Sequence, residues 1–335
     1  MAKAPHFPPP RPIPPRSRLF QRTPPAVFPP IFGLFGLGLA WRRASETFGV
    51  PGGAADMLLG AVTLLYLFAV VAYLAKVVQR PGVFHEDLRV LPGRAGLASM
   101  MLAGMLLAST LAPLGENWQP AAQVVLALAV AGHVLLAVTI ARDLITGPEE
   151  SRVVTPVWHL SFVGFIVSPL AALPLGWGVY NSVVLWATFA LAVAIWVISI
   201  RQFIRKDVPA PLRPLLAIHL SPAALLGTVA MMTGHPQLAL GFGLLSIVIL
   251  AGLGGTARWL TAAGFSPLWG AFTFPLAAFS TLMQLLALAG YGEVFRILGG
   301  LSLVAATLII PPIAWKVVQM WMKGVLAAKT NAAQA

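Results

Sequence analysis

Residues 266–278 read Ser-Pro-Leu-Trp-Gly-Ala-Phe-Thr-Phe-Pro-Leu-Ala-Ala, which places the ring of Phe274 directly before Pro275 inside a long apolar segment. Proline lacks a backbone donor and clashes with the carbonyl four residues back, so this pattern predicts a kinked helix. The positions that share the helical face of Phe274 are all small: Gly270, Ala271, Ala277, Ala278 and Thr281. The stretch indicates a ring that plugs a space between helices, or one that fills a packing gap between close helices.

A repeat favours the plug over simple packing. Pro169, Pro222 and Pro275 are spaced 53 residues apart, and similar Leu- and Ala-rich residues follow each of them. Ser168, Ser221 and Phe274 therefore occupy equivalent positions. The spacing predicts a repeated unit of two helices with the proline in the first.

Composition identifies an integral membrane protein. The chain has 335 residues, of which 58% are hydrophobic and only 10% charged. Cysteine is absent, which excludes disulfides, thiolate metal ligands and cysteine nucleophiles. The net charge of +12 resides in loops and termini, where it reports membrane topology and not nucleic-acid binding.

The chain divides into three parts. Residues 1–25 are predicted to be a disordered, cytoplasmic, Pro/Arg-rich arm, since residues 1–30 hold eleven prolines and no acidic residue. Residues 26–323 are predicted to be an all-α transmembrane channel domain, and residues 324–335 a cytoplasmic tail.

Charge-free intervals predict ten transmembrane spans of about 20 residues each. They lie within 22–42, 56–76, 94–116, 116–142, 152–201 (two spans), 213–258 (two spans), 258–293 and 296–316. Ten spans put 19 of the 22 Lys and Arg residues on one side, which predicts that both termini are cytoplasmic.

The odd-numbered spans carry stripes of small residues, whereas the even-numbered ones are bulkier. We therefore expect five helical hairpins in a pseudo-five-fold ring, with the odd spans around an axial pore and the even spans facing lipid. Phe274 is the predicted pore gate, and Met101 is the next candidate. The other predicted pore-lining residues are Pro29, Gly33, Gly36, Gly104, Ser168, Pro169, Ser221, Pro222, Pro275 and Ala278.

The predicted spans contain few ionisable side chains. Asp and Glu occur only in loops or at span ends, which argues against an intramembrane proton relay. His219 is a possible pore ionisable group, although a packing role is the alternative, and His133 and His159 are not at matched depths for haem. Motifs of phosphate loops, zinc proteases and nucleophile elbows are missing, so we expect no enzyme activity, metal or cofactor. Basic vestibules favour anions as the permeant species.

Three motifs carry a resemblance to a known family. They are Trp269-Gly270-Ala271-Phe272-Thr273-Phe274-Pro275, then Gly33 with Gly38-Leu39-Ala40-Trp41, and Arg94 at the start of the third span. Over residues 26–323 the chain resembles the tellurite-resistance and dicarboxylate transporter family, which includes bacterial TehA-type proteins, yeast malate and sulfite permeases and plant slow anion channels. The resemblance implies ten helices around a central pore, a pore-occluding Phe at Phe274 and a homotrimer. Leu102, where bacterial members tend to have proline, and the hydroxyls of Ser168 and Ser221 depart from the pattern.

The sequence therefore predicts an anion-selective channel or channel-like exporter in the bacterial inner membrane. It would move small anions or oxyanions and be gated by a pore-occluding Phe. The alternative is a proton-coupled carrier of dicarboxylate, sulfite or tellurite that uses His219. A third reading is a structural or cofactor-binding membrane subunit.

The predicted membrane topology can be tested by cysteine labelling, because the chain has no native cysteine. Single cysteines at Ser45, Asn117 and Thr146 would be probed with an impermeant thiol reagent from outside the cell. We expect labelling at Ser45 and Asn117 and none at Thr146, because the basic loops stay inside. Labelling at Thr146 without labelling at Asn117 would overturn the assignment.

Overall fold

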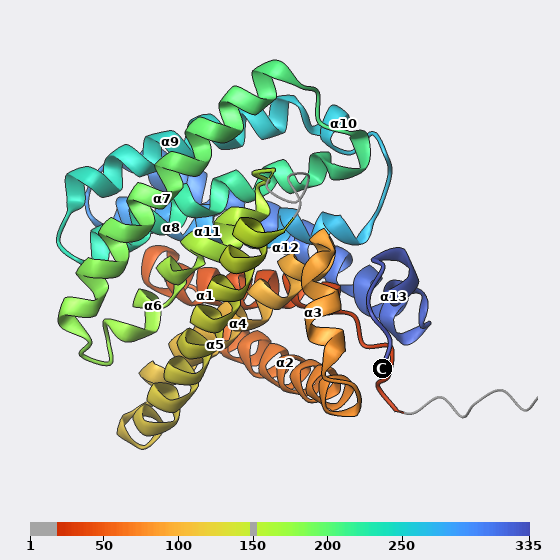
Figure 1. Ribbon diagram of the computed structural model, residues 1–335. Coiled ribbons are helices and arrows are strands. Elements are labelled where there is room, and N and C mark those ends of the chain that lie inside the picture. The colour runs from red at the N-terminus through yellow and green to blue at the C-terminus, as the bar shows by residue number, and fades with distance from the viewer. Residues whose placement is uncertain (1–18, 148–152) are drawn as a thin grey trace, which may run out of the picture.

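The computed structural model describes residues 19–147 and 153–335, and every regular element in this part of the chain is a helix (Figure 1). Eight helical segments are long and apolar enough to cross a membrane. They contain α2 (Gly53–Gln79), α4 (Leu91–Leu111), α5 (Gln119–Thr146), α7 (Gly178–Arg205), α8 (Leu220–Met232), α9 (Pro236–Gly255), α11 (Thr273–Leu288) and α12 (Glu293–Met322). The segments of α4, α5, α8 and α11 include the adjoining 3₁₀ helices, as in Ala210–Met232 and Pro267–Leu288. The chain is thus a multi-pass membrane protein.

Two further segments fall where the sequence predicts the first and fifth spans. The first, α1 (Phe28–Phe48), carries Arg42, Arg43 and Glu46 near its end. The second is a broken stretch of η5 (His159–Val163), η6 (Gly164–Val167) and α6 (Pro169–Ala172), which is shorter than the other spans. Neither is among the eight candidate spans, so the ten-span arrangement stays a prediction.

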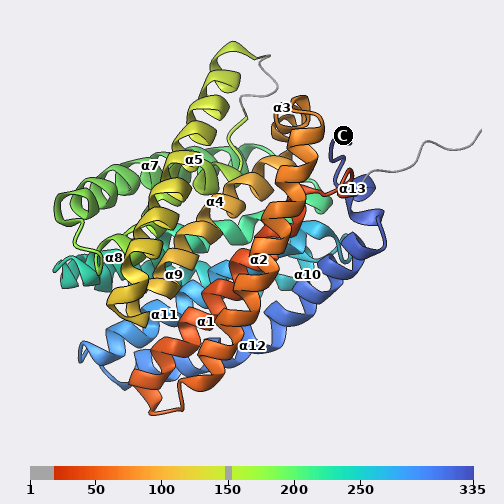
Figure 2. The same ribbon diagram turned by 90° about the horizontal axis from the view of Figure 1, so that it is seen from below.

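Burial separates the long helices into two sets. Between 61% and 78% of the segments containing α4, α8 and α11 is buried inside the protein, compared with 22–39% of α2, α5, α7, α9 and α12. Helix α1 belongs with the buried set, since most of its residues are enclosed. Figure 1 shows α1, α4, α8 and α11 near the centre of the molecule, and Figure 2 shows α2 running alongside α1.

The three repeated prolines mark helix starts. We expected interior kinks, but at each site the α-helix begins anew after a tighter 3₁₀ segment. Pro169 is the first residue of α6, after η6. Pro222 and Pro275 are the third residues of α8 and α11, after η7 (Ala210–His219) and η8 (Pro267–Phe272). The N–H groups of the first helical turn have no intrahelical acceptor, so proline sacrifices no hydrogen bond there. Starting a new helix at the proline therefore costs less free energy than a kink inside a continuous helix.

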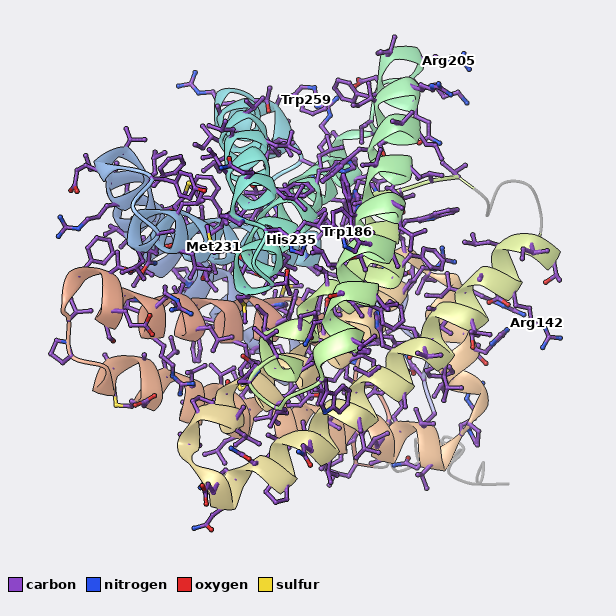
Figure 3. All side chains as sticks on the ribbon, turned by 90° about the vertical axis from the view of Figure 1, so that its left-hand side faces the viewer. Arg142, Trp186, Arg205, Met231, His235 and Trp259 are labelled. Carbon is purple, nitrogen blue, oxygen red and sulfur yellow. The ribbon has the colours of Figure 1, made fainter. Side chains whose placement is uncertain are left out.

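Short elements complete the chain. These are η1 (Pro25–Val27), α3 (Gly82–Arg89), η2 (Ala112–Leu114), η3 (Glu116–Trp118), α10 (Ala257–Leu260) and α13 (Val325–Lys329). In Figure 3 the labelled Arg205 and Trp259 lie toward the same end of α7 and α9. Trp186 and His235 lie further along, with ring centroids 5.6 Å apart.

A buried ion pair joins α2 to the short helix α3. Lys76 Nζ lies 2.7 Å from Asp87 Oδ2, and both side chains are fully buried. Tyr73 donates a hydrogen bond to the same carboxylate, and Lys76 donates one to the carbonyl of Thr23. The backbone N–H of Ala333 donates to Asp87 Oδ1, which joins the chain's C-terminal end to this site (Figure 1). The sequence predicts only that Asp and Glu lie in loops or at span ends, and it does not predict this ion pair.

This ion pair generates a stability prediction. Asp87→Asn leaves a buried lysine without its counter-charge and should lower the free energy of unfolding by about 3–5 kcal/mol. Thermal unfolding in mild detergent measures the loss. The joint replacement Lys76→Met with Asp87→Leu should restore much of it, because no buried charge remains.

Glu86→Gln is the matched control. Glu86 makes a two-point contact with Arg80 at the surface, at 2.6 and 2.7 Å, and this hydrogen bonding lowers the pKa of the Glu86 carboxyl. Exposed pairs add little to stability. Equal loss of stability in Glu86→Gln and Asp87→Asn would contradict the buried-pair account.

Candidate functional site

A stacked pair of aromatic rings occupies the centre of the buried helices. Phe274 of α11 lies against Phe32 of α1, with ring centroids 3.7 Å apart and planes inclined by 16°. Both rings are nearly enclosed. The Phe274 side chain therefore has an aromatic partner, whereas its own helix offers only small neighbours.

Two glycines of α1 make this contact possible. A methyl group on Gly33 would overlap the side chain of Thr273, and one on Gly36 would lie 2.9 Å from the Phe274 ring. Thr273 in turn donates hydrogen bonds to the carbonyls of Gly270, at 2.6 Å, and Pro29, at 3.3 Å. These contacts fix α1 against the start of α11.

Two small cavities adjoin the ring pair. The first has a volume of about 40 Å³ and reaches Pro92, Ser99, Leu215 and Pro267. The second has about 20 Å³ and reaches Leu102, His159, Val167 and Leu225, further along the same helices. Phe32 and Phe274 line both cavities, together with Leu160, Ile218 and Ser221. Each cavity has room for about one to three water molecules.

Every lining residue comes from the segments predicted as odd-numbered spans. These are α1 with η1, α4, η5 with η6, η7 with α8, and η8 with α11. No residue of α2, α5, α7, α9 or α12 lines either cavity. The same five segments thus line both cavities.

The cavity walls carry almost no charge. The polar side chains that line them are Ser99, Ser221 and His159, and no acidic or basic side chain does so. Arg94 lies between the lining residues Pro92 and Ala95 in the sequence, and its Nε donates to the carbonyl of Leu88. An anion at the ring pair would thus meet hydroxyl, imidazole and backbone groups.

A histidine pair adjoins the second cavity. His159 Nε2 lies 3.0 Å from His219 Nδ1, which requires one imidazole to donate and the other to accept. Nδ1 of His159 has no hydrogen-bond partner among the described residues. Sequence reasoning considered His219 but missed its partner, because the π-helical and 3₁₀ segments alter the rise per residue and bring the two rings to one level. His133 instead packs edge-on against Phe165.

The predicted pore residues fall into two groups. Pro29, Ser221, Pro222, Phe274 and Pro275 line one or both cavities.

The remaining predicted residues contact neighbouring helices. A methyl group on Gly132 of α5 would lie 2.7 Å from the Met101 sulfur, and one on Gly104 would lie 2.9 Å from the Tyr66 hydroxyl of α2. Ser168 Oγ lies 2.6 Å from the Tyr180 hydroxyl. Pro169 and Ala278 are buried and line neither cavity.

Comparison with known proteins adds one match. A family model described as voltage-dependent anion channel matches residues 22–318, which include every segment that lines the two cavities. No curated protein matches the chain.

Proposed function

The chain belongs to the voltage-dependent anion channel family, and on that premise we propose that it is an anion-selective channel closed by Phe274 stacked on Phe32. This is the family of TehA-type proteins and plant slow anion channels, and its members are transporters and channels, not enzymes. Membership implies anion transport across a membrane. The gate, the channel mechanism and the permeant species belong to the proposal.

One observation carries the proposal. Five segments that are far apart in the sequence line both cavities, and the two stacked rings line both cavities as well. We propose that the five segments surround the conduction path and that the partner helices form five hairpins, giving ten spans. The contrast in burial between the two helix sets supports this arrangement.

Charge distribution supports anions as the permeant species. The cavity walls lack carboxylates, which would repel anions, and most Lys and Arg residues fall on one side of the predicted spans. Weak contacts along the path let an ion leave as readily as it enters. We propose small inorganic anions, oxyanions or small dicarboxylates as substrates, in the bacterial inner membrane, with cytoplasmic termini. Homotrimer assembly is proposed from family resemblance alone.

The gate yields a prediction on conductance. Phe274→Ala removes the ring that both cavities share, so the cavities should join and anion current through planar bilayers should rise strongly. Phe32→Ala should raise the current as well, because Phe32 forms the other half of the stack.

Phe189→Ala is the control for loss of a ring. Phe189 lies on α7, contacts Phe242 at a centroid distance of 5.4 Å and lines neither cavity. It should lose stability without gaining current, as a packing residue does. If Phe274→Ala loses stability and its current stays at the wild-type level, the gate assignment fails.

A second candidate function is proton-coupled transport, and the histidine pair supports it. An imidazole pair at hydrogen-bond distance beside the second cavity could accept a proton as an anion passes. We favour the channel because the cavity walls offer no further ionisable group to continue a relay.

Reversal potentials in reconstituted liposomes separate the two functions. For a channel, the reversal potential should follow the anion gradient alone, at any proton gradient, in both the wild type and His219→Gln. A fixed dependence on the proton gradient that His219→Gln or His159→Gln abolishes would establish the carrier instead.

A further inference from the structure

A large apolar groove lies on the opposite side of α11 from the ring pair. Its volume is about 540 Å³, an order of magnitude above that of either cavity beside Phe274. Its walls come from α9, α10, the η8–α11 segment and α12, with a small part from η7 and α8. Leu301 and Ile309 on its rim are exposed, so the groove opens toward the lipid-facing surface.

The dimensions of the groove fit a single acyl chain. Its lining follows α12 from Leu298 to Ile313, which is about 22 Å at the helical rise. One leaflet's hydrocarbon layer is about 15 Å deep. The groove is therefore long enough for an acyl chain to lie along α12 with its CH₂ groups against the apolar lining.

Small residues create this space. Ala217, Gly254, Ala257 and Ala305 line the groove at positions where larger side chains would fill it. The remaining lining is almost entirely leucine, isoleucine and aromatic residues. A hydrocarbon chain would satisfy this surface without bringing polar groups into it.

Positive charge lies at one end of the groove. Arg258 is exposed and falls between the lining residues Ala257 and Thr261. Lys316 is exposed one turn beyond Ile313 on α12, with its Nζ 4.9 Å from the Phe265 ring centroid. Neither side chain forms an ion pair with another described residue. Two unpaired cations at headgroup level attract a lipid phosphate.

We propose that an anionic phospholipid occupies this groove, with one acyl chain along α12 and its phosphate between Arg258 and Lys316. The proposal does not rest on the channel function. Phe272, Leu276 and Phe279 form part of the wall, so the lipid lies against the reverse side of the segment that carries Phe274.

Native mass spectrometry tests the proposal with defined lipids. The full-length protein would be purified in mild detergent and offered equal amounts of phosphatidylglycerol and phosphatidylcholine. The wild type should retain phosphatidylglycerol preferentially. Arg258→Ala combined with Lys316→Ala should reduce that preference by roughly tenfold or more, because both headgroup contacts are lost.

Blocking variants test the acyl chain separately. Ala305→Trp places a ring inside the groove and should abolish retention of both lipids, and Ala305→Leu should weaken it. Val304→Trp is the matched control, since Val304 is the adjacent residue on α12, is exposed and lies outside the groove. It should retain lipid as the wild type does. Thermal unfolding of each variant checks that the fold is kept.

Three results would overturn the proposal. Unchanged lipid retention in Ala305→Trp would mean that the bound lipid lies elsewhere. An unchanged preference in the double charge variant would remove the headgroup site. If Ala305→Trp and Ala305→Leu convert an oligomer to monomers with no lipid bound in the wild type, the groove is an interface between copies.

Discussion

The close approach of α1 to the start of α11 determines the geometry of the whole centre. The Thr273 side chain packs against Gly33 and the Phe274 ring packs against Gly36. Because neither glycine has a side chain, α1 and α11 approach closely at these two positions. Stacking on Phe32 then follows from the register of the helices. A larger residue at either glycine would separate α1 from α11 and remove the surface on which Phe274 rests.

Backbone hydrogen bonding explains why the inner helices are broken at repeated positions. A backbone donor or acceptor that is left unpaired inside a membrane costs several kcal/mol, so proline is accommodated at least cost in the first turn of a helix, where its missing N–H would have no intrahelical partner. A 3₁₀ segment followed by a new α-helix meets this requirement at Pro169, Pro222 and Pro275. The same device shifts side chains relative to a continuous helix, and it brings His159 to His219.

The sequence predicted features that depend on neighbours along the chain. Phe274 was identified because the small residues around it are local, and the inner and outer helix sets followed from side-chain size. Phe32 was missed because its own helix is rich in aromatic residues, so nothing distinguishes it until α11 is in place.

Met101 and Gly104 share a small-residue stripe, but they face α5 and α2, since a helix in an inner ring also needs small residues on its outer side. Lys76 was counted only as a topology signal, because burial of its ion pair with Asp87 depends on tertiary packing that the sequence does not show.

The energetics of the ring pair suit a gate that moves without rearranging the helices. Stacking of two aromatic rings contributes about 0.5–1.5 kcal/mol beyond the burial of their area. Both rings border the two cavities, but each cavity has room for only a few water molecules, so rotation of a ring would also require neighbouring side chains to shift. Closed and open states that differ by a few kcal/mol can be shifted by a ligand or field of similar energy. Because Asp, Glu, Lys and Arg are absent from the cavity walls, the proposed channel would use the ring pair to control passage and the basic residues beyond it to select the ion.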